Sequence, residues 1–172
     1  MLSPDEIDYL NKLPEEIANK IIVIKPFSSL LSSMANNLIS LVKNKFPDLA
    51  VKHMGASGLG ISGQGDLDIY ALANQSEFDK YLPGLKEIFG KPIGESPGSI
   101  AWKFDQDGTD IEFYLTDPDS PTIQKQIRVF ETLKHNPQLL AEYEKLKTGL
   151  NGSTYKEYQQ AKYEFYHRIL DN

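Results

Sequence analysis

The stretch HMGASGLGISGQGDLDIYAL, residues 53–72, decides the fold because it joins a glycine-rich segment directly to a strand. In a strand, successive side chains point to opposite faces of the sheet. Asp66 and Asp68 therefore share one face, while Leu67 and Ile69 share the other. The stretch predicts a glycine turn that leads into a strand carrying two carboxylates on one face.

The sequence on either side of this stretch predicts a mixture of helices and strands. Before it, the periodicity of apolar residues and the capping residues predict a helix from Ser3 interrupted near Pro14, a short strand over 21–27, a helix over 29–45 and a strand over 49–54. After it, they predict a helix over about 76–89, a β-hairpin over 99–115 and helices that begin near 120, 137 and 154.

This order of elements predicts the α+β class, with a small mixed β-sheet flanked by helices and followed by a C-terminal helical portion. The length of 172 residues suits a single domain over 1–172. Within it we expect a core over 21–116 and a helical extension over 117–172 that packs on the core.

Composition excludes several classes of function. The chain has no cysteine, which excludes disulfides, thiolate zinc sites and cysteine nucleophiles. Its net charge is −6 and it has no basic tract, so general nucleic-acid binding is not expected. No signal peptide and no apolar run of membrane-spanning length is visible, so we expect a cytoplasmic protein without membrane contact.

The two aspartates predict a site for a divalent cation. At i and i+2 on a strand their Cα atoms lie about 6–7 Å apart, and two unpaired carboxylates on one face repel each other. Mg²⁺ or Mn²⁺, which prefer oxygen ligands, would remove that repulsion. The backbone of Gly55, Ala56 and Ser57 can approach phosphate oxygens closely, so a nucleoside triphosphate is the expected ligand.

Two familiar phosphate-binding motifs do not fit. The Walker motif requires Gly-Lys-Ser/Thr after the glycines, and the dinucleotide fingerprint requires a helix where this chain has a strand.

The predicted hairpin supplies a third acid. In TDIEFYL, residues 109–115, Asp110 and Glu112 share one face. Either acid could complete a three-carboxylate metal site. Glu112 is favoured as the residue that also takes a proton from an attacking hydroxyl, because Asp110 lies closer to the turn.

These motifs resemble those of a known superfamily. MGAS followed by GDLDI is similar to the nucleotidyltransferase signature of Gly-Ser, a gap, Asp-x-Asp and a later acid on a strand. RVFETLKHNPQLLAEYEKLK (128–147), YQQAKYEFYHRIL (158–170) and IIVIKPF (21–27) look like the corresponding stretches of GrpB-like proteins. The resemblance spans about residues 21–170.

This resemblance implies metal-dependent transfer of a nucleotidyl group from a nucleoside triphosphate to an unknown hydroxyl acceptor. Asp66, Asp68 and Glu112 would be the catalytic acids. The chain departs from the common GrpB-like pattern, because Gln64 and Gly65 replace a Lys-Pro and Ala56 is inserted before Ser57.

Cationic side chains on the predicted C-terminal helices could offset phosphate charge. Lys162 falls on the inward stripe of the last helix, and Arg128 is a second candidate. Lys147 is expected to be a surface lysine whose stem packs on Tyr143.

Two alternatives remain open. The chain could bind a nucleotide or metabolite without catalysis on the same fold. It could also be a structural or partner-binding module, with a homodimer formed through the aromatic-rich last helix.

Overall fold

The computed structural model describes residues 2–171, and its centre is a five-stranded sheet. The strands are β1 (Ala50–Met54), β2 (Leu67–Leu72), β3 (Gly94–Ser96), β4 (Ser99–Gln106) and β5 (Thr109–Thr116). Their order across the sheet is β1-β2-β5-β4-β3. β2 and β5 pair in parallel and all other neighbours pair antiparallel, which confirms the predicted mixed sheet.

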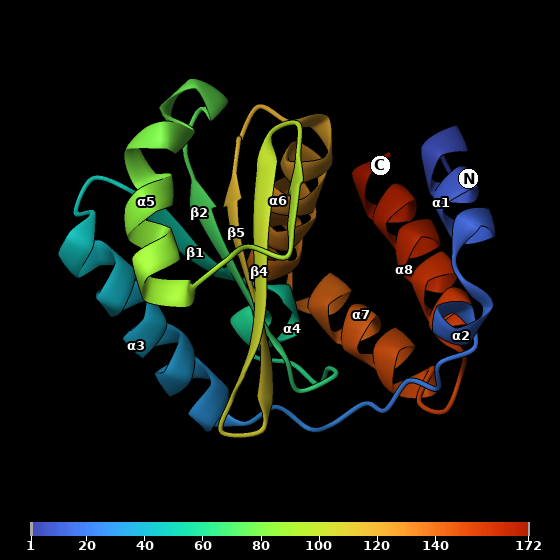
Figure 1. Cartoon of the computed structure of the whole chain (residues 1–172). Coiled ribbons are helices and arrows are strands. Elements are labelled where there is room, and N and C mark those ends of the chain that lie inside the picture. Colours follow the sequence, from blue (N-terminus) through green and yellow to red (C-terminus); the bar gives the residue numbers. More distant parts are fainter. Residues whose placement is uncertain (1, 172) are drawn as a thin grey trace.

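One face of the sheet packs against two helices, α3 (Ser29–Lys45) and α5 (Phe78–Phe89), as Figure 1 shows. A 3₁₀ turn, η1 (Gln75–Glu77), precedes α5. The main core lies here, and Leu67, Ile69 and Phe113 are completely buried in it. Because strand side chains alternate, burial of these residues turns Asp68 and Glu112 to the opposite face.

On the other side lie the helices α6 (Pro121–His135), α7 (Pro137–Gly149) and α8 (Tyr155–Leu170). They share a second apolar cluster that includes Leu133 and Phe165. Ala56 and Ile61, from the glycine segment, also belong to this cluster. The glycine segment therefore connects the sheet with the predicted helical portion.

The structure differs from the sequence prediction in three places. Residues 21–27 form only isolated bridges, Ile21 with Thr154 and Lys25 with Gly63, so the predicted strand is wrong. The first glycines lie in a short helix, α4 (Gly55–Leu59), where only a turn was expected. The loop over 90–98 contains the edge strand β3, whose exposed Gly94–Ser96 carries no strand signal.

None of the helices within residues 2–171 combines the length and the apolar character that crossing a membrane would require.

The N-terminal helices α1 (Pro4–Lys12) and α2 (Glu15–Ala18) pack on α8, with both chain ends on the same side of the molecule (Figure 1). Glu6 attaches α1. Its carboxylate accepts hydrogen bonds from Lys125 on α6 at 2.6 Å and from His167 on α8 at 2.7 Å. Burial alone would raise the pKa of Glu6, but these two hydrogen bonds outweigh it and lower the pKa to about 2.

Replacement of this carboxylate tests its contribution. We expect Glu6→Gln to lower the free energy of unfolding at pH 7 by about 1.5 kcal/mol and Tm by roughly 3–6 °C. A carboxyl with a lowered folded pKa stabilises the fold above its unfolded pKa. The difference between the two proteins should therefore shrink as the pH falls below 4.5 toward 2.

Thermal unfolding from pH 7 to pH 3 measures this difference. Glu16→Gln, at an exposed position on α2, is the control and should leave Tm unchanged. An equal loss in both variants at pH 7 would show that the contacts of Glu6 are not the cause.

Candidate functional site

The candidate site is built around a close contact between Gly55 and Asp68. Gly55 has φ +68°, and a Cβ atom at this position would lie 2.2 Å from Oδ2 of Asp68. Asp68 is also the β2 residue that pairs with Met54 at the end of β1. Glycine is required here for two reasons, the backbone conformation and the space that the carboxylate takes.

The strand register places Glu112 beside Asp68. The two residues are direct partners in the parallel pair of β2 and β5. Asp110 pairs with Asp105 in the hairpin and is exposed. Of the two acids considered for the third position, Glu112 is therefore level with Asp68, whereas Asp110 lies toward the turn.

The environment of Asp68 disfavours its charged form. Burial, and then the negative charges of Asp66 and Glu112, raise its pKa to about 7. The positive charges of Lys162 and Lys147 act in the opposite direction but do not cancel this effect. Asp66 and Glu112 are thus both close enough to Asp68 for their charges to act on it.

Glu112 is held by two neighbours. Lys103 on β4 donates a hydrogen bond to Oε1 at 3.0 Å, and the Tyr114 hydroxyl donates a short hydrogen bond to Oε2. Burial favours a raised pKa for Glu112, but the hydrogen bonds from Tyr114 and Lys103 outweigh it, so its pKa is lowered. Sequence reasoning missed Lys103, although the two-residue Asp107-Gly108 turn of the hairpin fixes its register opposite Glu112.

Two lysines from the C-terminal helices, Lys147 and Lys162, act electrostatically on Asp68. Lys147 on α7 is only 6% exposed, which contradicts the expected surface position. Its amine does lie over the Tyr143 ring, at 5.2 Å from the centroid. The reason for the burial is the packing of α7 against the glycine segment, where a Cβ on Gly63 would lie 3.6 Å from Nζ.

The two amines differ in their electrostatic balance. Burial and the like charge of Lys162 lower the pKa of Lys147 to about 8. Burial also opposes the charge on Lys162, but Tyr166, Tyr163 and the two aspartates outweigh it and raise its pKa. Within residues 2–171, neither amine lies within 4.0 Å of a carboxylate oxygen of Asp66 or Asp68.

The predicted phosphate-binding residues have distinct positions. Ala56 and Ser57 are buried. The Ser57 hydroxyl donates to the carbonyl of Asp66 at 3.0 Å and lies 2.9 Å from Nε2 of His53. These contacts fix the start of β2 relative to α4. Arg128 is exposed on α6, and its charge is not among the causes of the shifted pKa of Asp68.

The predicted metal site stays a prediction. Within residues 2–171, no three or more His, Cys, Asp or Glu side chains form a group that could hold a metal ion. Asp66 and Asp68 fit a divalent cation, because the repulsion that raises the pKa of Asp68 would be relieved by it. Glu112 belongs to no such group of described residues, and its two oxygens accept hydrogen bonds from Lys103 and Tyr114.

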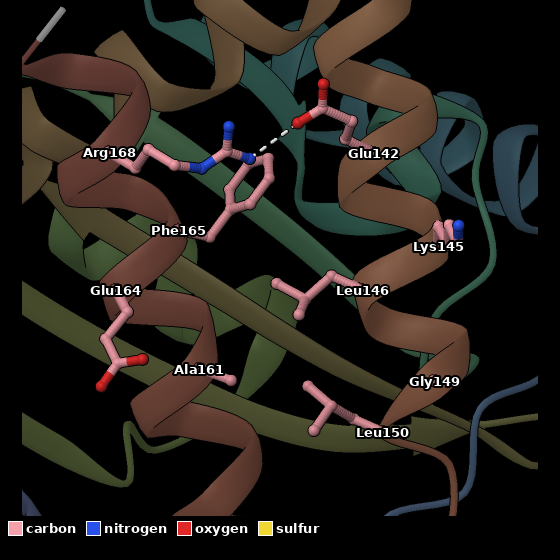
Figure 2. A pocket seen from close by; sticks show the side chains of 9 residues that line it. All are labelled: Glu142, Lys145, Leu146, Gly149, Leu150, Ala161, Glu164, Phe165 and Arg168. Carbon is pink, nitrogen blue, oxygen red and sulfur yellow. Dashed lines mark hydrogen bonds and ion pairs between the residues drawn. The ribbon is translucent and has the colours of Figure 1, made fainter.

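A separate groove of about 670 Å³ lies between α7 and α8 (Figure 2). Arg168 lies over the ring of Phe165, 4.7 Å from its centroid, and donates to Glu142 at 2.7 Å. None of the site residues that the sequence predicted lines this groove.

The predicted homodimer was expected to form through the aromatic-rich last helix, which is α8. Two of its aromatic side chains, Phe165 and Tyr166, are buried within the chain. The homodimer stays a prediction.

The comparisons with known proteins agree on one family. The family model described as GrpB protein matches residues 21–172. A UPF0157 protein of Vibrio cholerae is 25% identical over 138 residues, which are 72% of this chain and 67% of that protein.

Two solved structures illustrate the similarity of the fold. The crystal structure of the conserved protein GrpB from Enterococcus faecalis has a TM-score of 0.68 and 14% identity, covering 87% of this chain and 98% of that one. This similarity confirms the fold. The RNA terminal uridylyl transferase Cid1 has a TM-score of 0.45 at 15% identity, and the match covers 79% of this chain but 44% of Cid1.

Substitution of Gly55 tests the close contact. We expect Gly55→Ala to lower the free energy of unfolding by roughly 2–4 kcal/mol, through backbone strain and the clash with Asp68. Gly60→Ala is a matched control, because Gly60 has φ +72° but no atom within 4 Å of its added Cβ. It should cost about 1 kcal/mol. Denaturant unfolding of both variants measures the difference, and equal losses would contradict the clash.

The raised pKa of Asp68 predicts a pH-dependent stability. A carboxyl with a raised folded pKa destabilises the fold once it ionises, from its unfolded pKa of 3.8 up to about 7. In metal-free buffer, Asp68→Asn should therefore have a higher Tm than the wild type at pH 8. This advantage should shrink between pH 7 and pH 4.

Lys147 does not contribute to this pH dependence below pH 8. Its lowered pKa reduces the free energy of unfolding by a constant amount there, because the amine is protonated in both the folded and the unfolded chain. Asp110→Asn, at the exposed position on β5, should not change the pH profile. A lower Tm for Asp68→Asn at pH 8 would contradict the assigned electrostatics.

Proposed function

This chain belongs to the GrpB protein family, and from that membership and the geometry of its site we propose that it binds a nucleoside triphosphate and transfers a nucleotidyl group to a hydroxyl acceptor. The proposal is carried by one observation. The charges of Asp66 and Asp68 act on two lysine amines without forming ion pairs with them, so charges of both signs stay available to a ligand.

A triphosphate bound with a divalent cation matches this arrangement of charges. Phosphate oxygens would lie toward the amines of Lys147 and Lys162, which offset their negative charge. The cation would lie between the phosphates and the carboxylates of Asp66 and Asp68. Burial strengthens both interactions, because charges in a partly dehydrated site are poorly screened by water.

The proposed cation is Mg²⁺ or Mn²⁺, held by oxygen ligands of Asp66 and Asp68. When bound, it would supply charge stabilisation to the reacting phosphate. The backbone of Gly55 to Ser57 remains the proposed phosphate contact beside it. Lys147, and not the exposed Arg128, is the second cation proposed to offset phosphate charge beside Lys162.

Glu112 is the proposed general base. Its lowered pKa keeps it ionised at neutral pH, and it already accepts a hydrogen bond from a hydroxyl, that of Tyr114. In the transfer step, the acceptor oxygen forms a bond to the α-phosphorus while the bond to pyrophosphate breaks. The hydroxyl proton passes to Glu112.

A second candidate is nucleotide or metabolite binding without catalysis. The engagement of both Glu112 oxygens by Lys103 and Tyr114 favours it, because such a carboxylate is less available as a base. Tight binding of a Mg-nucleotide without release of pyrophosphate, tested with a panel of hydroxyl acceptors, would select this candidate.

Calorimetric titration with ATP and Mg²⁺ at pH 8 tests the ligand class. We expect Asp68→Asn to remove the Mg-dependent binding, and Lys147→Met or Lys162→Met to weaken it by about tenfold each, as for the loss of one charge-assisted hydrogen bond.

Lys145→Met provides the matched control, because Lys145 lies on the same helix as Lys147 but is exposed. Its affinity should equal that of the wild type. An unchanged affinity in Asp68→Asn would refute the proposed site.

A further inference from the structure

Two neighbours of Glu112 have no place in the proposed reaction. Lys103 and Tyr114 occupy different oxygens of the carboxylate, Oε1 and Oε2. We call the three residues the Glu112 clamp. Each partner is set by strand geometry, since Lys103 is the direct β4 partner of Glu112 and Tyr114 follows two residues later on the same face of β5.

The clamp is fixed more firmly on one side than on the other. Tyr114 stacks on Tyr70, with ring centroids 4.8 Å apart and an interplanar angle of 17°. The Lys103 side chain is 47% exposed, so its ion pair with Glu112 is partly in water. To release Glu112, the partly exposed Lys103 side chain would have to move away, and the hydrogen bond from the stacked Tyr114 would have to break.

In the described part of the chain, Glu112 is part of no three-acid metal group although the strand register brings it level with Asp68. Its charge nevertheless acts on Asp68. Two carboxylates bind a divalent cation less strongly than three, because each further oxygen ligand adds charge and coordination.

We propose that Lys103 and Tyr114 are positioning residues that hold Glu112 out of the cation site and thereby set its affinity for divalent cations. Release of Glu112 completes the three-carboxylate site. This inference rests on the proposed function, because it requires a cation between Asp66 and Asp68.

The direction of the effect follows from the charges. Loss of the Tyr114 hydroxyl removes a hydrogen bond that competes with a cation for Oε2 and that holds the carboxylate toward Tyr114. Loss of the Lys103 amine frees Oε1 and also removes a positive charge that repels a cation. Both changes should therefore strengthen cation binding, and both should do so through Glu112.

The test is titration of the full chain with Mn²⁺ alone at pH 8, with free Mn²⁺ measured by its paramagnetic resonance signal. Lys103→Met and Tyr114→Phe should each bind Mn²⁺ about three- to tenfold more tightly than the wild type. Lys103→Arg, which keeps the ion pair, and Tyr70→Phe, which keeps the stacking, should stay within about twofold of it.

A double variant shows whether the gain passes through Glu112. Lys103→Met combined with Glu112→Gln should show no gain over Glu112→Gln alone. Thermal unfolding of every variant confirms that the fold is intact. Lys103 is exposed enough for its replacement to be tolerated, so Lys103→Met decides the question even if Tyr114→Phe unfolds.

Failure of the clamp and failure of the proposed site give different results. If Asp68→Asn loses Mn²⁺ binding but Lys103→Met binds with unchanged or weaker affinity, the clamp is refuted and the site stands. If Asp68→Asn binds Mn²⁺ as tightly as the wild type, the site is refuted and the clamp with it.

Discussion

The contact between Gly55 and the carboxylate of Asp68 is the constraint on which the rest of the structure depends. The space that a Cβ would fill at Gly55 is taken by Oδ2 of Asp68. β1 ends and α4 begins at this point, where the chain turns from the sheet toward the helices, and Asp68 on β2 lies directly beside the turn as the partner of Met54. The same turn sends Ala56 and Ile61 into the apolar cluster of the C-terminal helices. One backbone conformation thus joins the two cores and creates the candidate site between them.

The electrostatics of the site oppose the stability of the isolated chain. Asp68 is placed where its charge is disfavoured, and Lys147 is buried without a carboxylate partner within 4.0 Å among the described residues. A protein optimised only for stability would pair these groups or replace them with apolar ones. Their persistence in an otherwise well-packed fold is the pattern expected where a ligand supplies the missing charge.

Local sequence signals predicted most elements correctly. The apolar period gave the bounds of α3, Ser29–Lys45, and the capping residue Ser3 opens the helix that it predicted. The last helix begins where the sequence predicted it, near 154. The strand prediction for residues 21–27 was wrong because β-branched composition does not supply a partner strand. This segment hydrogen-bonds to the loop around Ser153 and to Gly63, and it forms isolated bridges there without a continuous ladder.

Tertiary packing decided what local signals could not. Lys147 shares a helix face with Tyr143, and such a face is equally compatible with a surface or a buried position. Its burial depends on how the glycine segment meets α7, where Glu144 accepts hydrogen bonds from the backbone N–H and the hydroxyl of Ser62. No periodicity along α7 encodes that contact. By contrast, the partner of Glu112 could have been found, since a two-residue Asp-Gly turn determines which residues of a hairpin face each other.

The apolar core enforces the positions of the acids through strand register. Ile111 and Phe113 are completely buried against α3 and α5, which fixes the face that Glu112 presents. A slip of one residue in β5 would expose these two side chains and bury the carboxylate of Glu112 among apolar groups, at a cost far larger than any gain at the site. The parallel pairing with β2 then brings Glu112 level with Asp68, and the hairpin turn brings Lys103 level with Glu112. The distances between the charged groups are thus determined by hydrophobic burial on the opposite face of the sheet, which allows the site to keep like charges together without distorting the strands that carry them.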